Sequence, residues 1–385
     1  MANEDLGNAR KAKGDEFYTQ FVDIQKEMNA YLEFNPDVFR GKTVLLPCDD
    51  PEWSNFTKYF AQNFEALGLK KLISTSYAPD SKPDAIPYQP TLFEMESPGY
   101  DPEKTQTKGK IFTLTHDKTG DNVINFDDLE WSYLEGGGDF RSEEITKLRD
   151  EADIVVTNPP FSLFREFLAW LEEANKSYVI LGNMNAITYK EVFPLIKENK
   201  LWLGASIHSG DREFRIPPTS ITRSPSRRTD EDGNVFLRVP GIRWFTNLDH
   251  GLRHEPLSLM SEKDNIKFSK HKEVKGVGYT NYENFDAIEV PFTDSIPADF
   301  SGLMGVPISF LSKYNPEQFE ILGNGQTMAN ELGIKPVGQK FVDDYYAQGN
   351  KGQISAKWNN LVYRRDETVV VPYQRIIIKH KQVKK

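Results

Sequence analysis

The sequence predicts an α/β protein whose central sheet is doubly wound, with parallel strands that alternate with helices. The alternation of buried-strand and helical patterns extends over residues 42–207. It begins with a strand at 42–47, a helix at 54–67 and a strand at 71–77. A strand–helix–strand start of this kind implies a right-handed crossover and parallel pairing. The apolar strand at 153–157 is followed by Asn158 and two consecutive prolines, as a buried parallel strand can be at the edge of a sheet.

Local signals support the individual elements. Apolar residues recur at helical spacing within 54–67, where Ser54 suits the N-cap and Gly68 the C-terminal end. Residues 78–110 are rich in Pro, Lys and Asp and predict an insertion or long loop. The remaining patterns predict strands at 110–115, 177–181, 201–207 and 239–247, and helices at 162–174 and 191–198.

The composition changes near residue 248, after which Gly, Pro and Asn are frequent and the periodicity is less regular. A chain of 385 residues is long enough for one large α/β domain and a smaller one. We therefore expect a catalytic domain over 1–248 and a second module over 249–385.

Bulk properties exclude several classes of protein. The chain has one cysteine, so no intrachain disulfide can form and a cytoplasmic setting is expected. No apolar run reaches the roughly 18 residues that a membrane span needs, and the first residues lack a signal-peptide pattern. The six histidines show no metal-ligand spacing, so we expect no metal. A net charge of −10 argues against a passive nucleic-acid coat but not against a DNA enzyme.

The most informative segment is the turn Asn158-Pro159-Pro160-Phe161, which follows the strand 153–157. The prolines stop the strand and remove two backbone donors. The amide oxygen of Asn158 and the carbonyl of Pro159 can both accept from one NH2 group, while the ring of Phe161 can stack on a planar substrate. The turn therefore suits a planar, amine-bearing substrate.

This turn resembles the fourth motif of S-adenosylmethionine-dependent amino-methyltransferases. Asn at its first position is typical of enzymes that methylate adenine N6. The same turn occurs in methyltransferases that act on guanine N2 of ribosomal RNA and on glutamine N5 of proteins, so it identifies the chemistry better than the substrate.

The methyl donor should lie beside this turn, at the end of the first strand. Pro47, Cys48, Asp49 and Asp50 occupy that place, and either aspartate could accept from the donor's ammonium group. The Gly-x-Gly usual in such loops is absent, and no acid follows the strand 71–77 to bind the ribose. Cys48 is not expected to be a nucleophile, because in cytosine-C5 enzymes the Pro-Cys pair lies on the fourth-motif turn.

Two further segments resemble donor-binding motifs of the same enzymes. Phe17, Tyr18 and Thr19 match the tenth motif, which covers the donor. Asp139 and Phe140 follow a run of three glycines and match the third motif, in which an acid accepts from the donor's adenine amine and an apolar neighbour packs on its ring. The order of tenth motif, donor strand, catalytic turn and extra module is the gamma arrangement of DNA amino-methyltransferases.

Taken together, the segments 48–56, 158–161, 243–247, 305–311 and 314–319 resemble the EcoRI-type adenine-specific DNA methyltransferases over most of the chain. The resemblance implies a Rossmann-like S-adenosylmethionine-dependent sheet with a C-terminal target-recognition module. It also implies that Asp49 and Asp50 line the donor pocket. The family's eighth motif maps near Arg243-Trp244-Phe245, where an aromatic ring could help to hold a flipped base.

Local basic patches could contact DNA in spite of the acidic total. We expect DNA contacts from the arginines that lie between 211 and 228 and from the eighth motif: Arg212, Arg215, Arg223, Arg227, Arg228 and Arg243. Residues 373–385 hold five basic residues and no acid, so this tail could either contact phosphates or lie free in solvent.

The function expected from these features is site-specific methylation of adenine N6 in double-stranded DNA, as in restriction–modification, on a base flipped out of the duplex. S-adenosylmethionine is the expected donor, with Asn158, Pro159, Pro160 and Phe161 as the catalytic turn. We expect a monomer whose relation to a restriction endonuclease is functional, not physical. Two alternatives are an RNA or protein-glutamine methyltransferase with the same turn, and an inactive DNA-binding relative.

Overall fold

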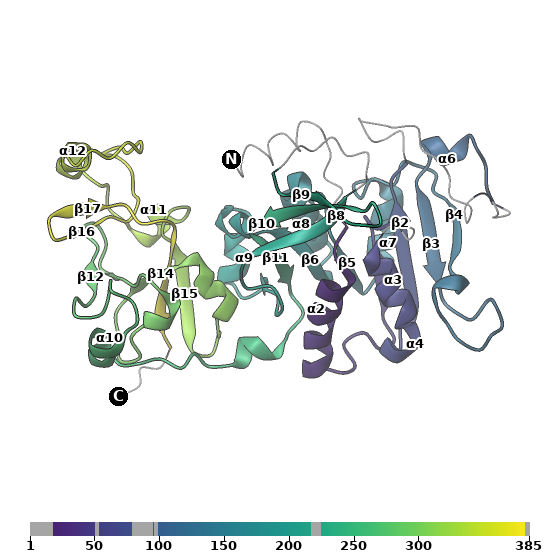
Figure 1. The fold of residues 1–385 in the computed structure, drawn as a ribbon, viewed down its shortest axis with the longest axis horizontal. Coiled ribbons are helices and arrows are strands. Elements are labelled where there is room, and N and C mark those ends of the chain that lie inside the picture. The colour runs from purple at the N-terminus through teal and green to yellow at the C-terminus, as the bar shows by residue number, and fades with distance from the viewer. Residues whose placement is uncertain (1–17, 51–53, 79–94, 96–98, 217–224, 382–385) are drawn as a thin grey trace. The chain divides into compact units, whose positions relative to one another are not determined.

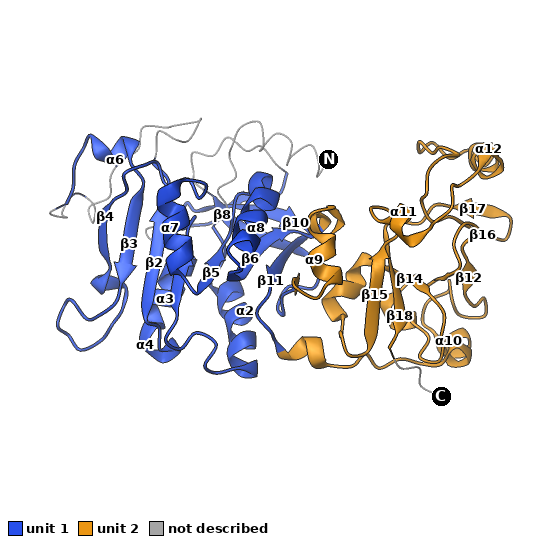
Figure 2. Ribbon diagram, turned by 180° about the vertical axis from the view of Figure 1, so that it is seen from behind, with its two compact units in different colours: residues 1–184, 203–250 blue, residues 185–202, 251–385 orange. Residues whose placement is uncertain are grey.

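The computed structural model describes residues 18–50, 54–78, 95, 99–216 and 225–381. Phe17 and Arg223 lie outside these residues. The chain divides into two compact units, one of residues 1–184 and 203–250 and the other of residues 185–202 and 251–385 (Figure 2).

The first unit is built on an eight-stranded mixed sheet, in the order β4-β3-β2-β1-β5-β6-β11-β7. Its strands are β1 (Thr43–Leu46), β2 (Lys71–Ser76), β3 (Lys110–Leu114), β4 (Glu130–Tyr133), β5 (Ile154–Thr157), β6 (Ser177–Asn183), β7 (Trp202–Leu203) and β11 (Ile242–Thr246). The central strands β2, β1, β5 and β6 are parallel. This sheet is Rossmann-like, as the sequence predicted.

The outer strands depart from the expected parallel pattern. β3 runs antiparallel to β2, β4 antiparallel to β3, and β11 antiparallel to β6. The strand predicted at 239–247 is two strands, because Gly241 adopts a φ of +71° between β10 (Val235–Pro240) and β11. The strand predicted at 201–207 is confined to the two residues of β7.

Helices cover both faces of this sheet (Figure 1). The helices are α2 (Phe21–Phe34), α3 (Asn55–Gln62), α4 (Phe64–Leu67), α6 (Lys104–Thr107), α7 (Glu143–Glu151) and α8 (Phe164–Glu173). Successive residues of β11 show the two faces: Trp244 packs against Phe56 of α3, and Phe245 packs against Phe164 of α8. The helix predicted at 54–67 is two helices that have the predicted ends, since Ser54 caps α3 and Gly68 ends α4 with a φ of +63°.

A small antiparallel sheet in the order β8-β10-β9 completes the first unit. It contains β8 (Asp211–Ile216), β9 (Arg227–Thr229) and β10. Phe214 of β8 and Val235 of β10 are buried in the same core as the strands β1 and β5. The small sheet is therefore an integral part of the first unit.

The second unit has a five-stranded sheet in the order β12-β13-β14-β18-β15. Its strands are β12 (Thr280–Asn281), β13 (Ile288–Glu289), β14 (Met304–Pro307), β15 (Phe319–Asn324) and β18 (Arg375–His380), with a separate hairpin of β16 (Tyr363–Arg365) and β17 (Thr368–Val370). Its helices are α9 (Phe193–Lys197), α10 (Glu262–Phe268), α11 (Ala329–Leu332) and α12 (Gln339–Ala347). Because α9 packs against β15, residues 185–202 belong to this unit and not to the first.

Candidate active site

The catalytic turn and the predicted donor loop lie at the same edge of the sheet. β1 pairs directly with β5, with Leu45 opposite Val155, so the loop after β1 emerges beside the turn after β5. Asp49 joins the two segments. Its Oδ2 accepts from Thr157 Oγ1 at 2.5 Å, and its Oδ1 accepts from Ser54 Oγ at 2.7 Å. One carboxyl group therefore fixes the donor loop to the strand that carries the catalytic turn.

Burial shifts the pKa of the Asp49 carboxyl group. The side chain is buried, and burial raises its pKa to about 7, although the hydrogen bonds from Thr157 and Ser54 act in the opposite direction. Both of its oxygens are engaged by hydroxyl groups. Asp50 is half-buried next to it, and its carbonyl accepts from the N–H of Ser54.

Hydroxyl side chains on β2 hold the donor loop from the other side. Ser74 Oγ donates to the carbonyl of Asp49, and Thr75 Oγ1 donates to the carbonyl of Pro47 at 3.0 Å. The N–H of Asp49 in turn donates to the carbonyl of Thr75 at 3.0 Å. The strand that lacks the expected ribose-binding acid therefore uses its polar side chains to position the loop. Sequence reasoning missed the positioning roles of Ser54, Thr75 and Thr157, because isolated hydroxyl residues give no pattern.

The glycine-rich loop reaches the end of β2. The N–H of Ala78 donates to the carbonyl of Gly137, and Gly138 has a φ of +83°. A Cβ at Gly138 would overlap the carbonyl oxygen of Ser76. Glycine is required here by both the backbone conformation and the close approach of β2.

Asp139 follows this glycine and is held by Arg141. Arg141 donates to Asp139 Oδ2 at 2.7 Å and to its Oδ1 at 3.0 Å, and contacts Glu166 of α8 at 3.2 Å. The bonds from the Arg141 guanidinium keep the pKa of Asp139 below its usual value. Asp139 is therefore a fixed carboxylate at this edge.

The expected stacking role of Phe140 is not supported. Its side chain is fully buried, with its ring 5.0 Å from that of Phe167 and 5.6 Å from that of Trp170. The ring belongs to the core beneath the loop because α8 packs against it. It has no accessible face for a donor's adenine.

Cys48 lies in the same neighbourhood and is half-buried. Burial raises the pKa of its thiol, and the negative charges of Asp49 and Asp139 raise it further. Cys48 and Asp139 are thus close enough to interact electrostatically, and donor binding by these two segments stays a prediction. A thiol with a raised pKa is a poor nucleophile, in keeping with the expectation that Cys48 is not catalytic.

The described part of the tenth-motif segment packs beside the donor loop. Tyr18 exchanges two backbone hydrogen bonds with Arg215 of β8, at 2.9 and 3.1 Å. The carbonyl of Thr19 accepts from Asn55 at the start of α3, at 2.8 Å. The hydroxyl Oγ1 of Thr19 is buried and has no hydrogen-bond partner among the described residues. A buried, unused hydroxyl beside the loop fits a site that a polar ligand completes.

The catalytic turn leaves β5 and enters a 3-10 turn over Phe161–Leu163. Leu163 N–H donates to the carbonyl of Pro160, whereas no described residue donates to the carbonyl of Pro159. Asn158 and Phe161 are half-buried. The ring of Phe161 stands 6.4 Å from that of Phe214 at 76°, so one side of it is fixed by the core. The amide oxygen of Asn158 is itself buried, so the predicted hydrogen bond from a substrate amine to this turn stays a prediction.

The predicted DNA-binding arginines have different environments. Arg212 and Arg215 lie on β8, and Arg227 and Arg228 on β9. Arg228 forms a bidentate ion pair with Glu213, at 2.7 and 2.5 Å, and stacks 4.4 Å from the centre of the Phe236 ring. The backbone of Arg215 pairs with that of Tyr18 in the tenth-motif segment.

Arg243 has the opposite character. Its side chain is 6% exposed, donates to the carbonyl of Ile242 at 2.6 Å, and leaves Nε without a partner among the described residues. Burial lowers its pKa, and the positive charge of Arg212 lowers it further. Arg212 also has a buried Nε without a described partner. No carboxylate in the described chain offsets this pair of cations.

The aromatic residues beside Arg243 do not form a base-holding surface. Trp244 and Phe245 are both fully buried, on opposite faces of β11. The expectation that an aromatic of this motif holds a flipped base is therefore not met, because the strand is central and both rings are in the core. Two residues of the basic tail are engaged: Arg375 and Lys379 lie on β18 and pair with Glu289 and Glu320, whereas Lys384 and Lys385 lie outside the described residues.

No group of three or more His, Cys, Asp or Glu residues could hold a metal ion in the part of the chain that the structure describes. No helix among the described residues is long and apolar enough to cross a membrane.

Comparison with known proteins agrees with the geometry. The family model described as the adenine-specific methyltransferase EcoRI matches residues 5–381. The Type II methyltransferase M.EcoRI of Escherichia coli is 42% identical over 320 residues, which are 83% of this chain and 89% of that protein. The Type II methyltransferase M.MpnI of Mycoplasma pneumoniae is 35% identical, over 82% of this chain and 84% of its own length.

A further relative, the Type II methyltransferase M.MgeORF184P of Mycoplasma genitalium, is 34% identical over 82% of this chain and 85% of its own length. No solved structure matches the chain significantly. Because the family model covers nearly the whole chain and the relatives cover most of it, the chain belongs to the EcoRI family of adenine-specific DNA methyltransferases.

Proposed function

We propose that this enzyme transfers the methyl group of S-adenosylmethionine to the N6 amine of an adenine that is flipped out of double-stranded DNA. One observation carries the proposal: the Asn158–Phe161 turn and the donor loop emerge from adjacent parallel strands and are joined through Asp49. An amine held at the turn would therefore lie beside a methyl donor held at the loop.

The residues at this edge fit S-adenosylmethionine. The donor's polar groups could be met by the buried, unpartnered hydroxyl of Thr19, by the half-buried Asp50 and by the fixed carboxylate of Asp139. Cys48, Pro47 and the backbone of Tyr18 would form the walls. When bound, S-adenosylmethionine supplies an electrophilic methyl group on a positively charged sulfur.

Asn158 and Pro159 make adenine N6 reactive by accepting hydrogen bonds from its amine. The N6 lone pair is delocalised into the ring, and bonds to both N–H groups favour a pyramidal nitrogen with a localised lone pair. These bonds strengthen as positive charge develops on nitrogen, so they stabilise the transition state more than the ground state. The Pro159 carbonyl is available for this role because no described residue donates to it. Phe161 would stack on the base and fix its orientation.

A base inside a duplex cannot reach this turn, so the adenine must leave the stack. Holding an extrahelical nucleotide requires contacts to its flanking phosphates. Arg212 is suited to this task, because it is only half-buried and forms no ion pair with a described carboxylate. Arg243 is buried, so it would act through its charge and not by direct contact. Arg228 is less suited, because Glu213 already holds its guanidinium.

A chromosomal substrate would place the enzyme in the cytoplasm, and methylation of one strand at a time is compatible with a monomer. Its relation to a restriction endonuclease would be functional, through a shared DNA site.

The test is methylation of unmodified genomic DNA by the full-length protein with S-adenosylmethionine, followed by mass spectrometry of the nucleosides. Wild type should produce N6-methyladenine. Asn158→Ala should lower the turnover about 100-fold or more, because one preorganised transition-state contact is lost, while its donor affinity and thermal stability stay near wild type.

Titration calorimetry with S-adenosylmethionine serves as the control for both proteins. Donor binding without any methylated nucleoside would redirect the proposal to an RNA or protein substrate. Equal turnover in wild type and Asn158→Ala would remove Asn158 from the mechanism.

A further inference from the structure

A groove in the second unit has five amide side chains among the residues that line it. It has two lobes, with cavity volumes of about 380 and 220 Å³. Both lobes are lined by Gln326, which follows β15, and by Asn360, which precedes β16. Asn330 and Asn359 line the larger lobe and Gln374 the smaller one. We call this feature the amide groove.

The groove has a composition suited to nucleic acid. No Asp or Glu lines either lobe in the described structure, although the chain holds 57 acidic residues and has a net charge of −10. Lys357 lines the larger lobe. Two exposed aromatic residues, Trp358 and Tyr373, lie on its walls, with exposed fractions of 40% and 64%. Arg375 lines the smaller lobe. Amide groups with these two cations and no lining carboxylate can face base edges and phosphates without charge repulsion.

Some of the amides are already committed to the fold. Asn359 donates to the amide oxygen of Asn330 at 2.9 Å and to the carbonyl of Ile334 at 2.8 Å. Gln374 accepts from the amide of Asn324 at 3.3 Å. In contrast, the side-chain amides of Gln326 and Asn360 have no hydrogen-bond partner among the described residues. These two shared residues are therefore the ones that can bond a ligand with both a donor and an acceptor.

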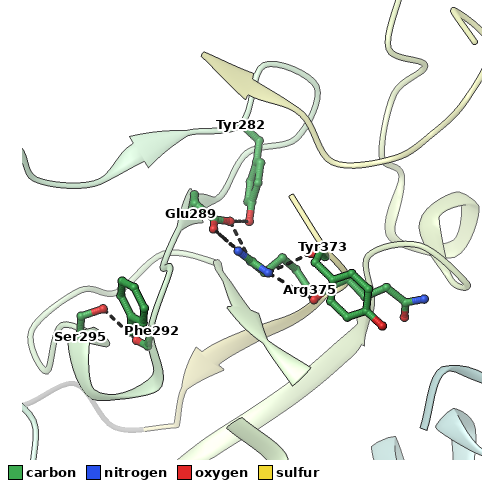
Figure 3. Close-up of polar contacts among 7 residues, drawn as sticks. Tyr282, Glu289, Phe292, Ser295, Tyr373 and Arg375 are labelled. Atoms are coloured by element: carbon green, nitrogen blue, oxygen red, sulfur yellow. Dashed lines mark hydrogen bonds and ion pairs between the residues drawn. The ribbon is translucent and has the colours of Figure 1, made fainter. Parts of the chain in front are cut away.

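Buried polar contacts hold the walls of the groove. Arg375, at the start of β18, makes a bidentate ion pair with Glu289, whose carboxylate also accepts from Tyr282 (Figure 3). The same guanidinium donates to the carbonyl of Tyr373 at 2.9 Å, as Figure 3 shows. The buried carboxylate of Glu289 and the carbonyl of Tyr373 both accept hydrogen bonds from the guanidinium of Arg375. Arg375 is therefore a structural residue and not a free cation for DNA.

The opposite wall is held by Asn284, which is buried. Its amide donates to the carbonyls of Asn360 and Lys335, at 2.7 and 2.8 Å, and its oxygen accepts from the N–H of Val362 at 3.2 Å. The backbone at Asn360 is thus fixed, while its side-chain amide forms no hydrogen bond with a described residue. A rigid wall that presents an uncommitted amide is preorganised for recognition.

We propose that the amide groove reads base edges of the DNA, with Gln326 and Asn360 as specificity-determining residues and Lys357 as a phosphate contact. This inference rests on the proposed function and assigns the residues that select the site. An amide can bond bidentately to the major-groove edge of adenine, so adenine is the base each residue is best suited to read. The aromatic rings would pack against the sugar or the thymine methyl group.

The experiment compares full-length Gln326→Ala, Asn360→Ala and Lys357→Ala with wild type. The matched control is Gln353→Ala, which removes an exposed amide of the same unit that does not line the groove. Each protein methylates unmodified genomic DNA, and N6-methyladenine is mapped by sequencing. Donor affinity and thermal stability are measured in parallel, and both should stay near wild type because the four side chains are exposed or half-buried.

We expect Gln326→Ala and Asn360→Ala each to lower methylation of the wild-type site about tenfold or more, with relaxed preference at one base position. Lys357→Ala should keep the site preference but lower the salt dependence of binding by about one phosphate contact. Gln353→Ala should match wild type. The inference is overturned if both amide variants methylate the wild-type sites at the wild-type rate. A wild-type protein that forms no N6-methyladenine would overturn the proposed function first, and this inference with it.

Discussion

Asp49 shows how one residue can serve both the fold and the site. It is tied to Ser54 by its Oδ1 and to Thr157 by its Oδ2, and it lies between Cys48 and Asp50 on the predicted donor loop. Thr157 directly precedes Asn158. A change in the charge of Asp49 is therefore transmitted to both the donor loop and the catalytic turn through single hydrogen bonds.

Burial of Asp49 predicts a pH-dependent stability. Its pKa is about 7 in the fold and near 4 in the unfolded chain, so between pH 4 and 7 the native state holds a proton that the unfolded state releases. Stability should therefore fall as the pH rises from about 4 to about 7, and level off above 7. The total loss is on the order of 4 kcal/mol.

The measurement is denaturant unfolding of wild type and Asp49→Asn at pH 5, 6, 7 and 8. The neutral variant lacks this ionisation, so wild type should lose stability relative to it across the series. Parallel curves for the two proteins would show that the carboxyl is not held as the structure has it.

At the scale of an element, the glycine-rich loop is fitted to β2 by one residue. Gly138 combines a φ of +83° with a Cβ position that overlaps the carbonyl of Ser76, whereas Gly136, two residues earlier, meets only the flexible end of Glu144 at 3.7 Å. Asp139 follows Gly138 directly, so movement of the loop moves that carboxylate. The pair of glycines therefore offers a matched comparison.

We predict that Gly138→Ala destabilises the fold by about 1–3 kcal/mol, through backbone strain and displacement of the loop from β2. It should also weaken S-adenosylmethionine binding by moving Asp139. Gly136→Ala should remain near wild type in both respects. Unfolding curves measure the stability of the two variants, and titrations with S-adenosylmethionine measure their donor affinity. Equal losses of donor affinity in the two variants would contradict the assignment of Asp139 to the donor site.

At the scale of the whole molecule, the two units do not follow the chain in simple order. Residues 185–202 leave the first unit, contribute α9 to the second and pack against β15 before the chain returns at β7. Phe193 and Ile196 of α9 are buried. A boundary placed at residue 248 from composition alone therefore separates α9 from its partner.

A chain that ends at residue 250 should therefore aggregate, because the apolar face of α9 loses the strand that covers it. The matched control carries the same truncation with residues 185–202 replaced by a short Gly/Ser linker, and it should stay monomeric. Size-exclusion chromatography and circular dichroism test both. A well-behaved monomer from the simple truncation would show that α9 does not depend on β15.

The sequence predicted the features that depend on neighbouring residues. The strand before Asn158, the caps at Ser54 and Gly68, and the Pro-Pro turn all follow from local chemistry, and the structure has them. The link from Thr157 to Asp49 joins residues 108 positions apart, so no local pattern contains it. The antiparallel direction of β3 and the burial of Phe140 and Trp244 depend on which segments pair, and residue spacing does not determine this.

Cys48 is a natural site for attaching a spectroscopic label. It is the single cysteine of the sequence, it is half-buried, and it lies on the loop between Pro47 and Asp49. A thiol-reactive fluorophore would therefore label one known position of the wild-type enzyme, with no engineered residue and no background labelling. Burial raises the pKa of the thiol, so alkylation should be slow near neutral pH, and protection by added S-adenosylmethionine would test whether the donor lies against this loop.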